Sequence, residues 1–209
     1  MRKEGGFFMF GKRKWIFIIT VVLVVCAALL CAIFLASEEW ANGADQPTLV
    51  VNTPQKIDPA ATGSFVVDVS ISSLGEAAYP AMSMSISFDT DRLEFMGVEE
   101  GNVPILGENG QPALPEWIYN TASCNQSGCI NVMYLDMTGG QHAFSKELIA
   151  EEDNVILRLR FRLKGSARAG DVMDLIVEDA VFAASDEKDS LAMTLDTLKV
   201  RNGKIVIGE

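Results

Sequence analysis

The sequence predicts an all-β domain, a sandwich of nine strands, preceded by one transmembrane helix. Two observations predict the sandwich: many short stretches alternate between apolar and polar residues, and clusters of Gly, Pro and Asn separate them. A third observation, one long uninterrupted apolar run near the N-terminus, predicts the helix.

The apolar run covers residues 15–36, WIFIITVVLVVCAALLCAIFLA. As a helix it would be about 33 Å long, which suffices to cross a bilayer core of about 30 Å. Basic residues 12–14 precede it and Glu38 follows it, so the positive-inside rule places residues 1–14 in the cytoplasm as a basic tail. The alternative is a signal peptide cleaved near residues 41–43, but the run is longer than the apolar core of most signal peptides.

Residues 37–47 carry no secondary-structure pattern and are interpreted as a linker that reaches at most about 40 Å. Residues 48–209 would then form one extracellular domain of a single-pass cell-membrane protein. The chain has a net charge of −11, and its first 14 residues hold five basic side chains against one acidic side chain, so the outer domain is strongly acidic. Acidity argues against binding to nucleic acid or to anionic lipid, and fits an extracellular module or the attraction of a basic partner.

The nine expected strands follow in order. They are residues 48–53, 64–73, 81–89, 93–101, 116–122, 130–138, 154–164, 174–184 and 199–207. One short helix is expected at residues 145–151, with Ser145 as its N-cap and Glu147 in its first turn.

The strand expected at 81–89 has two different faces. One face carries the apolar side chains Met82, Met84, Ile86 and Phe88, and the other carries Ala81, Ser83, Ser85 and Ser87. The second face is a flat surface of small and hydroxyl side chains. In the strand expected at 154–164, alternate positions are Arg or Lys, and we expect these to face acidic neighbours such as Asp68 on an adjacent strand.

Few residues are candidates for a disulfide, a metal site or catalysis. Cys124 and Cys129 flank the expected turn between strands 116–122 and 130–138, and outside the cell they are expected to form a disulfide. A metal site there lacks further ligands. The chain has one histidine, His142, and no nucleophile motif, and its acidic pairs such as Asp89 and Asp91 fall in expected turns, so no catalytic site is predicted.

Taken together, residues 48–207 resemble the cohesin domain of cellulosome scaffold proteins. The resemblance is carried by residues 87–89 with 93–95, the strand end 97–101, and residues 132–136, 154–165, 177–178, 182–183 and 202–205. It implies a jelly-roll topology and the binding of a calcium-loaded, helical dockerin module, commonly part of a polysaccharide-degrading enzyme. Calcium would belong to the dockerin, so no metal or cofactor is expected on this chain.

The resemblance also implies where dockerin would bind, on a sheet face built from the third, fifth, sixth and eighth strands. The residues carried over are Ala81, Ser83, Ser85, Trp117, Tyr119, Asn131, Met133, Leu135, Asp136, Glu187 and Asp189. Cohesins commonly carry Asn and Asp near positions 81 and 83. Their replacement here indicates a different class of dockerin, or a face that no longer binds one.

Two alternatives to dockerin binding remain. A carbohydrate-binding module of related fold would need a planar row of exposed aromatic side chains, for which Trp117 and Tyr119 are the candidates. A structural or adhesive surface module would associate with itself.

Overall fold

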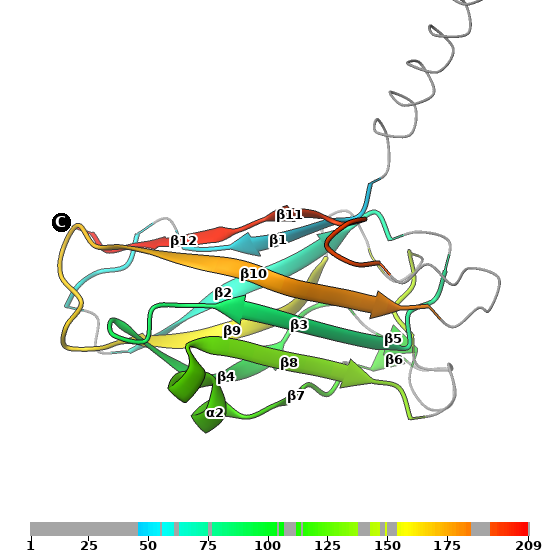
Figure 1. Ribbon diagram of the computed structural model, residues 1–209, viewed down its shortest axis with the longest axis horizontal. Helices are drawn as coiled ribbons and strands as arrows, with labels where there is room; N and C mark the ends of the chain where they lie inside the picture. The colour runs from blue at the N-terminus through cyan, green and yellow to red at the C-terminus, as the bar shows by residue number, and fades with distance from the viewer. Residues whose placement is uncertain are drawn as a thin grey trace, which may run out of the picture. The chain divides into compact units, whose positions relative to one another are not determined.

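The computed structural model (Figure 1) describes residues 46–208 apart from residues 55, 61–62, 75–76, 104, 107–111, 114, 138–142, 147–148, 150–153 and 185–192. In this part of the chain no helix is long and apolar enough to cross a membrane. The span expected at residues 15–36 lies outside the described residues, as does most of the helix expected at 145–151.

Two five-stranded sheets form the sandwich, and each strand follows an alternating stretch of the sequence. The first sheet has the order β11-β1-β2-β9-β4. Its strands are β1 (Thr48–Asn52), β2 (Ser64–Ser72), β4 (Leu93–Glu100), β9 (Val155–Leu163) and β11 (Lys199–Arg201). The second sheet has the order β12-β10-β3-β8-β7. Its strands are β3 (Ala81–Ser87), β7 (Ile118–Tyr119), β8 (Cys129–Leu135), β10 (Val172–Ala183) and β12 (Gly203–Val206).

All strand pairs within the two sheets are antiparallel except the parallel pair of β1 with β11. From β2 onward the chain passes back and forth between the sheets, and Figure 1 shows β10, β3 and β8 in one layer with β2 and β9 behind them. A small separate hairpin, β5 (Ile105–Leu106) with β6 (Pro112–Ala113), lies in a region for which the sequence predicted only a loop. Helix α2 (Thr121–Ser127) precedes β8.

The expected count of nine strands in the sandwich was wrong, because the last predicted strand is two strands. The chain leaves the first sheet at Asn202 and enters the second at Gly203. The Asn202 side chain accepts a hydrogen bond from Val177 N (3.0 Å), and a Cβ at Gly203 would lie 2.7 Å from Val51 Cγ1. Only a residue without a side chain lets the strand cross this closely between the sheets.

The core lies between the sheets and draws on both. Met82 and Phe182 from the second sheet and Phe95 and Phe161 from the first are each at most 1% exposed. The ring of Phe88, which follows β3, reaches across to that of Phe161 with 5.6 Å between centroids. Full burial of a side chain of this size stabilises the fold by about 1.5–3 kcal/mol. Because Met82, Met84, Ile86 and Phe88 are all buried, the expectation that the apolar face of β3 points inward is confirmed.

The outer face of the first sheet carries several ion pairs. Arg158 Nε lies 3.2 Å from Asp68 Oδ1, Arg160 pairs with Glu99, and Arg162 Nη2 lies 2.5 Å from Glu94 Oε2. These acids come from the two strands that flank β9: Asp68 and Glu94 lie directly opposite Arg158 and Arg162 in the register, and Glu99 lies diagonal to Arg160. The expectation that the arginines face acidic neighbours is confirmed, and this face is balanced in charge.

Candidate functional site

The outer face of the second sheet is organised in rows that run across its strands. Residues paired directly across antiparallel strands point to the same side, so the registers define each row. The Ala81 row contains Ala183, Ala81 and Leu135, and the Ser83 row contains Val181, Ser83, Met133 and Ile118. The Ser85 row contains Asp179, Ser85 and Asn131, and the Ser87 row contains Ile176, Ser87 and Cys129. We call these four rows the docking face.

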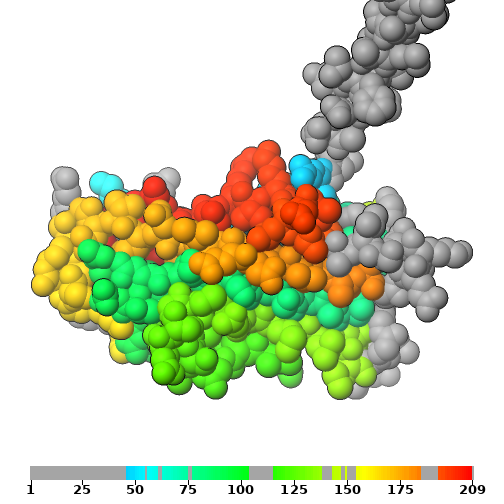
Figure 2. Space-filling view, in the orientation of Figure 1, coloured from blue at the N-terminus to red at the C-terminus, as the bar shows by residue number. Residues whose placement is uncertain are grey.

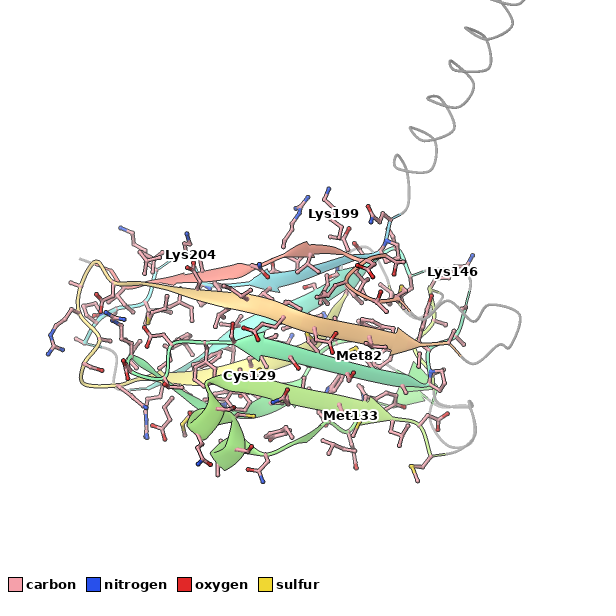
Figure 3. The ribbon with its side chains drawn as sticks, in the orientation of Figure 1. Met82, Cys129, Met133, Lys146, Lys199 and Lys204 are labelled. Carbon is pink, nitrogen blue, oxygen red and sulfur yellow. The ribbon has the colours of Figure 1, made fainter. Side chains whose placement is uncertain are left out.

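The docking face has a lane of small residues with apolar side chains beside it. Ala81, Ser83 and Ser85 are half-buried within the sheet. On β8, next to that lane, Met133 is 42% exposed and Leu135 45%, and on β7, beyond β8, Ile118 is 55% exposed. Figure 2 shows β10, β3 and β8 as adjoining bands on the side that faces the viewer, and Figure 3 places Met133 and Cys129 along the same strand. The expectation that the small face of β3 points outward is confirmed.

The polar groups of the Ser85 row are already hydrogen-bonded to one another. Ser85 Oγ donates to Asn131 Oδ1 (2.8 Å), and the Asn131 amide donates to Cys129 O (3.4 Å). These hydrogen bonds hold two polar side chains in place in the middle of the face.

Two acidic residues lie beside that row at an irregularity of β10. The register shifts between Val177 and Asp179, which leaves Glu178 as the extra residue of a β-bulge. Glu178 and Asp179 are exposed, and neither forms an ion pair with another described residue. Asp174, further along β10, lies 3.5 Å from Lys204 Nζ. The bulge therefore adds uncompensated negative charge to one side of the docking face.

Trp117, expected on the docking face, lies elsewhere in the structure. Its side chain packs against the core, with its ring stacked on Phe144 at 6.1 Å between centroids and edge-on to Tyr134 at 5.9 Å. Tyr119 is 38% exposed, but it pairs with Val132 of the inward side of β8, and its ring meets the buried ring of Phe95. These two residues close the edge of the sandwich rather than lie on the docking face.

Ile118, between them, is the residue of β7 that faces outward, opposite Met133. If the pairing of a strand shifts by one residue, its inward and outward side chains change places. The two residues of β7 are too few for an alternating pattern to show which of them points outward. The outward residues of β10, Asp179, Val181 and Ala183, were missed as well. Their signal was the alternation of residues 174–184, which the bulge interrupts.

The remaining predicted site residues lie at the margin of the face or outside the described part. Asp136 directly follows β8, is partly exposed, and its N–H donates to Pro80 O (2.7 Å). Glu187 and Asp189 lie outside the described residues, as does His142. In the described part of the chain no three His, Cys, Asp or Glu side chains gather as metal ligands.

The expected disulfide is absent: Cys124 and Cys129 are free thiols. The segment read as a hairpin turn is helix α2, which begins after the N-cap Asn120 and ends at Gly128, whose φ is 71°. The helix turns Cys124 into the core, whereas Cys129 opens β8 and points to the docking face. Burial, the carboxylate of Glu178 and the neighbouring Cys124 raise the pKa of the Cys129 thiol, so it is neutral near pH 7.

The fold and this face define a β-sandwich binding module. Residues 49–201 match the family described as the cohesin domain. The chain belongs to the cohesin family, whose domains are non-catalytic binding modules, and it is therefore not an enzyme. No curated protein matches the chain.

Solved structures agree with the fold. The sixth cohesin of scaffoldin B from Acetivibrio cellulolyticus, solved in complex with a Cel5 dockerin, is 22% identical, with a TM-score of 0.58 over 77% of this chain and 98% of that one. The OlpA cohesin in a type I cohesin–dockerin complex from Clostridium thermocellum is 18% identical, with a TM-score of 0.58 over 78% and 99% of the two chains. A cohesin module of a family 33 glycoside hydrolase from Clostridium perfringens is 9% identical, with a TM-score of 0.54 over 79% and 99%.

Proposed function

We propose that this protein binds a dockerin module through the docking face and holds the dockerin-bearing protein at the outer surface of the cell. The observation that carries the proposal is the combination of cohesin family membership with an outward lane of small residues on β3 that has exposed apolar side chains on one side, on β8 and β7. Cohesins similar in fold to this chain were solved in complex with dockerins.

The physical basis of docking is close approach. The small side chains Ala81, Ser83 and Ser85 let the backbone of a partner helix come near the sheet. Met133, Leu135 and Ile118 then supply the apolar area that a partner would cover, and apolar or aromatic residues at the centre of an interface carry most of its binding free energy. Calcium would belong to the dockerin, and the proposal gives this chain no metal or cofactor.

Anchoring is the second part of the proposal. Residues 15–36 would cross the membrane, and the linker would keep the domain within about 40 Å of it. At its far end the linker is fixed to the domain, since Pro47 O accepts a hydrogen bond from Lys199 N (2.8 Å) and the Gln46 amide donates to Thr197 O (3.3 Å). The protein would then tether, at the cell surface, an enzyme that degrades polysaccharides.

The docking face does not favour the carbohydrate-binding alternative. Such a module stacks sugar rings on exposed aromatic side chains, but Trp117 packs against the core and Tyr119 closes the sandwich edge. The outward members of the four rows are aliphatic, sulfur-containing or polar.

The test is calorimetric titration of residues 46–209 with calcium-loaded dockerin modules of the same genome. Gln46–Glu209 is a compact unit, and every core residue in the described part of the chain lies between Leu49 and Ile207, so the segment is expected to fold alone. We expect submicromolar binding of at least one dockerin, lost when EDTA removes the partner's calcium. Failure of every dockerin to bind, together with retention of the domain on insoluble polysaccharide, would contradict the proposal.

A further inference from the structure

One edge of the sandwich is basic, although the domain as a whole is strongly acidic. Residues 46–209 contain twelve Lys and Arg side chains against twenty-four Asp and Glu. Strands β11 and β12 form this edge, and residues 48–57 run beside them, from the pair of Thr48 with Lys199 to the bridge of Ile57 with Ile207. These segments carry four exposed cations, which we call the basic edge: Lys56, Lys199, Arg201 and Lys204. Figure 3 shows Lys199 and Lys204 on the same side of the domain.

The cations of the basic edge lack the partners that other cations of the domain have. Elsewhere in the described part of the chain, arginines pair with acidic residues or donate to backbone carbonyls, and Lys164 donates to Thr90 O (2.6 Å). By contrast, Lys56, Lys199 and Arg201 form no ion pair with another described residue. Lys204 Nζ lies 3.5 Å from Asp174 Oδ1, but the two side chains are 61% and 59% exposed, so this pair is weak.

Acidic residues flank the basic edge but do not interrupt it. Asp196 lies before its beginning and Asp58 beyond its end, and both are exposed. Between them, residues 48–57 and 197–207 contain no Asp or Glu. Because salt at about 0.1 M screens charges beyond about 10 Å, a surface that touches this edge interacts mainly with its four cations. The net acidity of the domain therefore does not prevent this edge from meeting an anionic surface.

The chain that would come from the membrane joins the domain at the beginning of the basic edge. Lys199 N donates to Pro47 O (2.8 Å), and the Gln46 amide donates to Thr197 O (3.3 Å), so the point of attachment is held next to Lys199. Residues 37–45, which precede it, extend to at most about 32 Å. So short a tether raises the effective concentration of the membrane surface at this edge, and a weak contact is then enough.

We propose that the basic edge contacts the anionic phospholipid headgroups of the membrane to which the domain is tethered. This inference rests on the anchoring part of the proposed function and adds a second, electrostatic contact to it. A Lys or Arg at an anionic lipid surface raises partition onto that surface about fivefold. Four such side chains on one edge, with the tether beside them, hold the edge against the headgroups.

This contact orients the docking face. Figure 1 shows β11 and β12 along one side of the domain and β8 and β7 along the opposite side. In the second sheet, β10 separates β12 from β3, so contact through the basic edge leaves the lane of small residues uncovered. The exposed acids Glu178 and Asp179 of β10 are repelled by anionic headgroups, which keeps the docking face turned away from the membrane.

Sedimentation with sucrose-loaded vesicles tests the contact. Residues 46–209 are mixed at low salt with vesicles of phosphatidylcholine alone, or of phosphatidylcholine with about one third phosphatidylglycerol. We expect partition onto the second kind only, and a fall of at least fivefold when salt is raised to about 0.3 M. Lys199→Gln and Arg201→Gln should each lower partition about fivefold, and together about 25-fold.

The matched control is Lys164→Gln, which removes the same charge from an exposed lysine directly after β9, a strand that β1 and β2 separate from β11. It should change partition less than twofold, and thermal unfolding checks that all variants remain folded. Equal partition onto both kinds of vesicle, or equal losses in Lys164→Gln and Lys199→Gln, would overturn the inference. Release of the domain by about 10 mM inorganic phosphate at constant ionic strength would do so too, because it indicates a site for a free anion.

The anchoring on which the inference rests is tested separately. The full chain should stay in the membrane fraction through an alkaline carbonate wash, which removes proteins held by charge alone. If the full chain is washed off while residues 46–209 still bind the anionic vesicles, the anchoring fails and the lipid contact of the basic edge stands. If the full chain stays and residues 46–209 do not bind, only this inference is overturned.

Discussion

The phenol oxygen of Tyr119 lies over Gly97, where a Cβ would be 3.1 Å from it. Tyr119 belongs to β7 and Gly97 to β4, which are edge strands of the two different sheets. The contact joins those edges at a β-bulge of β4, where Gly97 has a φ of 143°. This junction positions β7, and with it Ile118 on the docking face.

Gly97→Ala is expected to destabilise the domain by about 1–3 kcal/mol. The new methyl group would press on the Tyr119 ring, and alanine rarely adopts this backbone conformation. Urea unfolding measures the loss. Gly165→Ala, at a glycine with open space around it, is the matched control and should cost less than half as much. Equal losses in both variants would contradict the close contact.

Asn125→Ala should also destabilise the domain, by about 2 kcal/mol. The Asn125 side chain accepts from Phe95 N (2.9 Å) and donates to Phe95 O (2.8 Å), so it takes the place of a neighbouring strand at the edge of the first sheet. Its removal leaves two backbone groups of a buried residue without partners. Asn125→Asp, which keeps only the acceptor, should fall between wild type and Asn125→Ala in the free energy of unfolding.

Asp89 makes stability depend on pH. Burial raises its pKa, but hydrogen bonds from the Arg92 side chain (2.5 Å) and from the N–H groups of Asp91 and Arg92 outweigh burial and lower it overall. A lowered pKa in the folded state means that this stabilisation is complete above the unfolded value of about 4 and is lost as the pH falls through the folded one. We expect Asp89→Asn to cost about 1 kcal/mol at pH 7 and much less at pH 3, measured by urea unfolding. A constant difference at both pH values would contradict this assignment.

The two thiols of the domain should react differently. In residues 46–209, Cys124 is 2% exposed and should react with a thiol reagent only on unfolding. Cys129 should react in the folded domain, though slowly at pH 7, because its raised pKa leaves little thiolate. Reaction kinetics with a chromogenic disulfide, with Cys129→Ser as control, measure both. An oxidised domain with no reactive thiol after unfolding would contradict the free cysteines.

The sequence predicted the structure correctly where alternating apolar and polar residues determine which side chains of a strand are buried. The parity of β3 was predictable because Met82 and Ile86 cannot be left in water while serines alternate with them. The pairing of Arg158 with Asp68 followed from the same alternation on adjacent strands. When apolar and polar residues alternate over several positions of a strand, only one of its two faces can point into the core.

The errors fall where periodicity is short or broken. In β7 only pairing with β8 decides that Ile118 points outward and Tyr119 inward, and no pattern in two residues could reveal it. In β10 the bulge at Glu178 reverses the alternation of inward and outward side chains. The position of that bulge depends on the pairing of β10 with β3, which the sequence of β10 alone does not reveal. Helix α2 did carry a signal, an Asn before and a Gly after the helical segment, but its cysteines drew the interpretation toward a disulfide.

The central claim, that the docking face binds the partner, is tested most directly by introducing arginine at one position on that face and at one control position on the other sheet. Ser83→Arg places a long charged side chain in the middle of the docking face, and Val66→Arg places the same side chain on the outer face of the first sheet, at a residue 37% exposed. The measurement is the Kd of each variant of residues 46–209 for a calcium-loaded dockerin that binds the wild-type domain, with folding checked by thermal unfolding. We predict that Ser83→Arg weakens binding at least 100-fold, a loss of about 3 kcal/mol or more, and that Val66→Arg leaves it unchanged. Unchanged binding by Ser83→Arg, or loss of binding by Val66→Arg alone, would contradict the account.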